Sequence, residues 1–77
     1  MVIDLIVHKT DDGFTAEVPS LKGCETWAHK EDEVIEKTVD LVKYYLALSD
    51  ETKIIVDKAR KYSNKIVYKI IFDKNSQ

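Results

Sequence analysis

Apolar and polar residues alternate in the N-terminal third of the chain. Over residues 2–9, every second residue from Ile3 to Val7 is apolar, which is the period of a β-strand with one buried face. The opposite face of this strand is partly apolar too, as is typical of a strand in the interior of a sheet. Shorter alternating segments follow at residues 13–18 and 24–29. The pattern predicts three consecutive strands.

Turn residues separate these strands. Asp12-Gly13 predicts a hairpin between the first two, because glycine tolerates the positive φ that tight turns require. Pro19 ends the second strand, since it has no N–H to donate to a neighbouring strand. Gly23 frees the backbone to turn again before Cys24. We therefore expect an antiparallel meander.

The hydrophobic period changes to that of a helix after residue 30. Over residues 31–48, apolar side chains occupy one half of a helix and charged side chains the other half. Acidic residues in the first turn, beginning with Glu31, meet the positive end of the helix dipole. The apolar half is wide enough to pack on a sheet. It comprises Val34, Ile35, Thr38, Val39, Leu41, Val42, Tyr45, Leu46 and Leu48.

The segment from residue 50 to 64 has two interpretations. Ile55, Ala59 and Tyr62 recur at helical spacing, whereas residues 54–56 are equally suited to a short strand. Residues 65–73 alternate again and predict a last strand. We expect a single domain over residues 1–77, an α+β fold with the order β-β-β-α-(α)-β. If the last strand lay parallel beside the first, the crossover would be right-handed.

Composition narrows the class of protein. The 77 residues are 44% hydrophobic and 34% charged, as in a soluble globular domain, and no segment approaches the ~18 apolar residues of a membrane helix. The first residues lack the features of a signal peptide, and the lone cysteine cannot form an internal disulfide, which together favour the cytoplasm. A domain this small is marginally stable alone, so we expect a dimer or higher oligomer.

Charge is unevenly distributed along the chain. Residues 1–51 have five lysines and twelve acidic residues, a net charge of −7, whereas residues 52–77 have a net charge of +5. The two halves could complement each other within or between subunits. Alternatively, the acidic half meets a basic partner or the basic half touches nucleic acid. Because the basic residues are interleaved with apolar ones, the first interpretation is favoured.

Residues capable of catalysis are few. Asp4, in the first strand, is where a Mg²⁺-binding nuclease would place an acid, but such chemistry needs several converging carboxylates. His8, His29 and Cys24 match no zinc-binding spacing, and a lone cysteine is more often a small buried hydrophobe than a nucleophile. We therefore expect no enzymatic activity, no metal site and no cofactor.

Two aromatic residues fall outside the predicted core. Trp27 points away from the side of its strand that carries Thr26, and Tyr44 falls on the polar half of the helix. Large aromatic side chains outside a core are enriched in contact surfaces. Trp27 and Tyr44 are the candidates for a partner or oligomer interface, although each could simply pack along neighbouring aliphatic side chains.

Over residues 2–48 the chain resembles the HicB-like antitoxin family. The positions that define the motif are Gly13, Phe14, Pro19, Gly23 and Cys24. The acidic start of the helix and residues 41–46 at its end also fit the family, whereas Lys30 stands where relatives often have a helix-capping threonine. The matching segments are Asp12-Gly13-Phe14, Ala16-Glu17-Val18-Pro19, Leu21-Lys22-Gly23-Cys24 and Thr26.

The resemblance implies a partial ribonuclease-H-like sheet covered by a helix. It also implies a protein that binds a HicA-type toxin, a small basic ribonuclease that cleaves messenger RNA, and covers its active site. Many relatives have a C-terminal DNA-binding domain, but this chain ends soon after its last strand, so we expect a free-standing member without direct DNA binding. Two alternatives stay open: an orphan homo-oligomer with no toxin partner, and a ribonuclease-H-like nuclease that uses Asp4.

Overall fold

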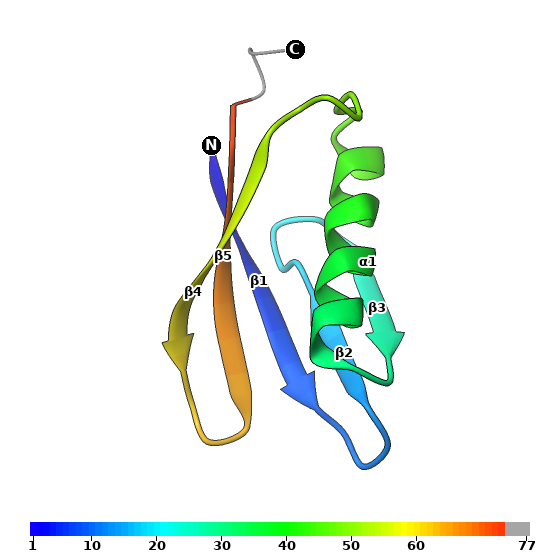
Figure 1. Cartoon of the computed structure of the whole chain (residues 1–77), viewed down its shortest axis with the longest axis vertical. Helices are drawn as coiled ribbons and strands as arrows, with labels where there is room; N and C mark the ends of the chain where they lie inside the picture. The colour runs from blue at the N-terminus through cyan, green and yellow to red at the C-terminus, as the bar shows by residue number, and fades with distance from the viewer. Residues whose placement is uncertain (74–77) are drawn as a thin grey trace.

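A computed structural model describes residues 1–73 and confirms the α+β class. One antiparallel sheet has the strand order β3-β2-β1-β5-β4, and a helix lies across one of its faces (Figure 1). The elements are β1 (Val2–Lys9), β2 (Phe14–Glu17), β3 (Glu25–Ala28), α1 (Glu31–Tyr45), β4 (Ile54–Lys61) and β5 (Lys65–Phe72).

The core lies between α1 and the sheet. β1 is the middle strand, and its Leu5 and Val7 are at most 2% exposed beneath the helix. β5 continues the same buried face with Ile70. This agrees with the prediction that the first strand is internal. The buried hydrophobic residues are Leu5, Val7, Ala16, Val18, Cys24, Ala28, Val34, Val42, Leu48, Tyr68, Ile70 and Phe72.

The helix packs on β1, β2 and β3 through Val34, Thr38 and Val42. The Thr38 hydroxyl donates to the Val34 carbonyl oxygen and lies 2.7 Å from the hydroxyl of Thr26 on β3. This pair satisfies a polar group that is fully buried, as buried hydroxyls require. Because its hydroxyl is hydrogen-bonded, Thr38 can occupy a buried position in the apolar half of α1.

The helix is shorter than the predicted residues 31–48. It ends at Tyr45, and Ala47 adopts a positive φ of 53° while the Leu48 N–H bonds back to the Lys43 carbonyl. This left-handed closure satisfies carbonyls at the helix end and redirects the chain. Tyr45, expected in the apolar half, is consequently 42% exposed, although Leu48 still reaches the core.

The second helix considered for residues 50–64 is not present. β4 occupies residues 54–61 and pairs antiparallel with β5, so the strand alternative is the correct one. Ile54 and Val56 sit opposite Phe72 and Ile70 and pack against the core. Pairing of the outer edge of β5 outweighs the helical spacing of the segment, because backbone hydrogen bonds and burial override weak local propensity. β5 is antiparallel to β1, so the fold has no parallel crossover between them.

The glycine at the first hairpin has a different role from the predicted one. Gly13 does not have a positive φ; in the described chain that conformation belongs to Gly23 among the glycines, with φ 80°. A Cβ on Gly13 would lie 2.5 Å from the Ala28 carbonyl oxygen and 2.8 Å from the indole ring of Trp27. Gly13 is required by this close approach of β3, not by turn geometry.

Candidate binding surfaces

The face of the sheet opposite α1, here called the open face, has no layer over it within the described residues. Its first row across the strands is apolar: Val2, Ile71 and Ile55 are paired neighbours, with Val2 57% and Ile55 44% exposed. Apolar side chains exposed together are typical of an interaction surface. The next two rows are Asp4, Lys69 and Asp57, and then Ile6, Val67 and Arg60.

Trp27 lies on this open face, at the edge formed by β3. It is 40% exposed, and its ring meets the His29 ring edge-on at a centroid distance of 4.5 Å. Its backbone carbonyl accepts a hydrogen bond from Lys37. The alternation of β3 correctly placed Trp27 opposite Thr26. Part of the indole covers Gly13, so Trp27 has a structural role in the fold while the rest of its ring stays exposed.

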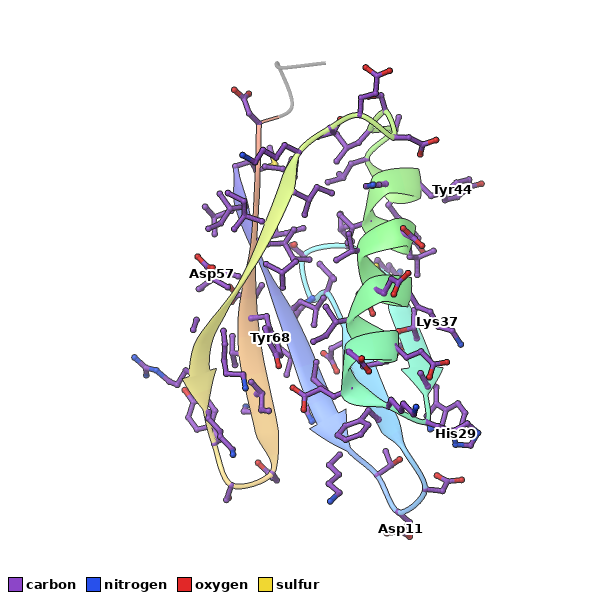
Figure 2. All side chains as sticks on the ribbon, in the orientation of Figure 1. Asp11, His29, Lys37, Tyr44, Asp57 and Tyr68 are labelled. Carbon is purple, nitrogen blue, oxygen red and sulfur yellow. The ribbon has the colours of Figure 1, made fainter. Side chains whose placement is uncertain are left out.

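Tyr44 lies on the other side of the molecule. It is 81% exposed and projects from α1 away from the sheet (Figure 2). The exposed face of α1, here called the acidic helix face, comprises Glu33, Glu36 and Asp40 around Lys37, and ends at Tyr44. Trp27 and Tyr44 therefore belong to two separate surfaces, and the structure does not bring them together.

The positive charge of the C-terminal half collects on the hairpin of β4 and β5. From Lys58 to Lys69 the chain has five basic residues and no acidic one. The end of this hairpin extends away from α1 (Figure 1). The charge asymmetry of the sequence thus becomes a separation in space, with acidic side chains on α1 and basic ones at the opposite edge of the sheet.

The candidate catalytic residues are dispersed. Asp4 accepts a hydrogen bond from the Lys69 ammonium, and His8 lies 3.5 Å from Glu17. Within residues 1–73 no three His, Cys, Asp or Glu side chains are grouped so that they could hold a metal ion. The nuclease alternative based on Asp4 therefore gains no support from the geometry.

Cys24 is 1% exposed, and burial raises the pKa of its thiol. A thiol in that state is mostly protonated at neutral pH and is a poor nucleophile.

The residues of the motif around Cys24 shape the turn between β2 and β3. Pro19 comes two residues after the end of β2 at Glu17. In the turn beyond it, the Cys24 N–H donates to the Leu21 carbonyl, and the Val18 N–H donates to the Cys24 carbonyl.

Sequence reasoning missed one contact of the helix start. The Tyr68 hydroxyl on β5 donates a hydrogen bond to the Glu31 carboxylate at the first turn of α1. Burial of Tyr68, followed by that hydrogen bond and the negative charge, raises the pKa of its phenol. No local signal reveals this pair, because the two residues are 37 positions apart and meet only when β5 joins β1.

Sequence reasoning also left Arg60 and Tyr62 out of the candidate residues. Arg60 is exposed and Tyr62 is 43% exposed on the hairpin. A signal was present, since a run of basic residues with aromatic residues between them is a footprint of polyanion binding. Because the sequence left both a helix and a short strand open for this segment, it did not show that Arg60 and Tyr62 lie near Val67 and Lys69 of β5.

Comparison with known proteins gives a related sequence. Over 47 residues the chain is 36% identical to a UPF0150 protein of Archaeoglobus fulgidus; the match covers 60% of this chain and 68% of that protein. No protein-family model matches the chain, and no solved structure does. No helix among the described residues has the length and apolar character needed to cross a membrane. The chain belongs to the UPF0150 family, which is related to the HicB-like antitoxins.

Proposed function

We propose that this protein is an antitoxin-like, non-enzymatic binding module. It neutralises a small, basic HicA-type ribonuclease by covering the toxin's active site. Membership of the UPF0150 family, with its relation to HicB-like antitoxins, is the observation that carries the proposal. The resemblance over residues 2–48 points the same way.

The acidic helix face is the surface we assign to the toxin. Glu33, Glu36 and Asp40 are exposed and outnumber Lys37 there, so they complement a basic ribonuclease surface. Tyr44 adds a large aromatic side chain that packs against nothing in the sheet. Aromatic side chains of this kind often contribute most of the binding energy of an interface.

The test is co-expression with the product of the adjacent reading frame. We expect a stable complex and relief of growth arrest. Tyr44→Ala combined with Asp40→Lys weakens both, whereas Glu51→Lys, the same charge reversal in an exposed loop outside α1, leaves both unchanged. No complex and no relief of toxicity would show the proposal to be wrong.

A second candidate, a homo-oligomer without a toxin, is favoured by the open face. Val2 and Ile55 expose apolar surface beside the half-buried Ile71, and a second copy of the chain would cover it. Sedimentation of the wild type and of Ile55→Lys separates the possibilities. A dimer that Ile55→Lys dissociates, together with no effect on any toxin, favours this alternative.

A further inference from the structure

We propose that the β4–β5 hairpin binds single-stranded RNA on the open face of the sheet. The binding site is formed by Arg60, Tyr62 and Lys65, with Ser63 and Asn64 at the turn. This function lies beyond toxin binding, which we assign to α1 on the other side of the sheet. Either proposal can fail without affecting the other.

The basic residues of the hairpin are largely unneutralised. Of the five, Lys69 has a carboxylate partner, Asp4, and sits opposite Asp57 in the strand pairing. The ion pairs described among residues 1–73, Lys69 with Asp4 and His8 with Glu17, include none of the other four. Lys58 instead lies over the Tyr68 ring and Lys65 over the Tyr62 ring, at 5.9 and 5.1 Å from the centroids. Unpaired cations gathered on one element attract a polyanion.

A bulge in β4 fixes which face the charge occupies. The pairing with β5 shifts between Lys58 and Arg60, so that Arg60 sits opposite Val67 on the open face, the face that also carries Asp57. Next to it is a hollow of about 310 Å³, lined by apolar and basic groups with one acid at its side. Its lining residues are Asp4, Ala59, Arg60, Tyr62, Val67 and Lys69.

Tyr62 is the residue that favours single-stranded RNA over duplex RNA. It lines the hollow, is 43% exposed, and follows Arg60 and Lys61 directly in the chain. An exposed aromatic ring flanked by cations stacks an unpaired base while the cations contact the adjoining phosphates. In a duplex the bases are already stacked on each other and unavailable to such a ring. The exposed side chains of Ser63 and Asn64 offer hydrogen-bond partners to a ribose 2′-hydroxyl.

The competing occupant is the acidic helix face of a second copy. Its carboxylates would neutralise the charges of the hairpin, but they provide no planar group that could stack on the exposed Tyr62 ring. The observations therefore favour RNA, and self-association becomes an outcome of the test.

The first measurement is the salt dependence of binding to a fluorescent 12-nucleotide RNA of mixed sequence. Two to four phosphate contacts give a slope of about −1.5 to −3 for log K against log salt. Arg60→Gln is expected to lower the steepness by about 0.7, the contribution of one contact to a single strand. Lys22→Gln, which removes an exposed cation from the loop after β2, should leave the slope unchanged.

The second measurement tests the stacking. Tyr62→Ala is expected to weaken RNA binding about tenfold, and Tyr62→Phe to retain it. Arg60 and Tyr62 are both exposed near the end of the hairpin, so their substitution should not disturb the core. Thermal unfolding of each variant verifies that the fold is intact. A DNA strand of the same sequence should bind more weakly than the RNA.

Three results would overturn the proposal. RNA binding that is absent, or equally sensitive to Lys22→Gln and Arg60→Gln, removes the hairpin as the site. Duplex RNA that binds as tightly as the single strand removes the stacking argument. Hairpin variants that dissociate a salt-sensitive dimer while RNA binding stays constant assign the hairpin to a second copy of the chain.

Discussion

The Tyr68 hydroxyl donates a hydrogen bond to the Glu31 carboxylate, and this contact ties the first turn of α1 to β5. α1 packs mainly on β1, β2 and β3, so the bond joins the helix to the half of the sheet that it covers least. Tyr68 is 7% exposed. Tyr68→Phe is expected to lower the free energy of unfolding by about 1.5–3 kcal/mol, the range for hydrogen bonds to charged groups.

A double-mutant cycle checks that value. Urea unfolding of Tyr68→Phe, Glu31→Gln and the double variant gives the coupling energy of the two side chains. Additive effects would mean that the hydrogen bond contributes nothing in solution.

The hydrogen bond between Tyr68 and Glu31 also predicts that the stability of the folded protein falls at alkaline pH. The pKa of the Tyr68 phenol is raised in the folded protein, so ionisation is easier in the unfolded chain, where the pKa is about 10. The stabilisation is therefore complete below about pH 10 and is lost progressively as the pH rises above it. We expect the unfolding midpoint of the wild type to fall more steeply above pH 10 than that of Tyr68→Phe. Parallel curves for the two proteins would contradict this assignment.

The N-terminus of α1 lacks a side-chain cap, so a capping residue there should stabilise the fold. Lys30 occupies the N-cap position with φ −121° and ψ 149°, and its side chain makes no capping hydrogen bond. The backbone already has the extended conformation that a capping residue needs, so Lys30→Thr should raise the free energy of unfolding by about 0.5–1 kcal/mol. Lys30→Ala is the matched control, since it removes the charge without adding a hydroxyl. Equal stability of the two variants would exclude capping as the cause.

The close approach at Gly13 predicts a steric penalty. A Cβ there meets a backbone carbonyl, which cannot move as a flexible side chain can. Gly13→Ala should lower the free energy of unfolding by about 1–3 kcal/mol. In a Trp27→Ala background part of this loss should persist, because the clash with the Ala28 carbonyl remains. Thermal unfolding measures both, and a neutral Gly13→Ala would show that the strands separate easily.

Burial of Cys24 predicts a protected thiol. Reaction with a disulfide reagent at neutral pH should be slow in the folded protein and immediate in denaturant. Ser20→Cys provides an exposed thiol in the loop after β2 for comparison, and that thiol should react at once. Rapid labelling of both thiols in native conditions would contradict the burial.

Prediction from the sequence succeeded where one local period dominates. The alternation in residues 2–9 and 65–73, and the helical period that starts at Glu31, each arise from a single buried face. For residues 50–64 the sequence left a helix and a short strand open, for a physical reason. The bulge after Lys58 breaks the alternation of β4, and Ile55, Ala59 and Tyr62 happen to match the spacing of a helix. The pairing with β5 decides the structure there, and pairing is not visible in the segment itself.

The candidate surfaces were predictable in part. Exposure of Trp27 and Tyr44 followed from the two periods, and both side chains are at least 40% exposed. That they lie on opposite sides of the sheet depends on the packing of α1. The grouping of Arg60 and Tyr62 beside Lys69 required the strand order and the bulge, neither of which has a sequence signature.

The two ends of the described chain are joined at one end of the β1–β5 strand pair. The Met1 ammonium donates to the Phe72 carbonyl oxygen at 2.6 Å, between residues 71 positions apart. One edge of β1 pairs with β2, but the other edge is paired only after β5, near the far end of the described chain, has been made. Loop closure over this distance makes folding slow compared with a helical domain of the same size. A nascent or clipped chain that lacks β5 exposes an apolar strand edge, so its lifetime in the cell is set by chaperones and proteases.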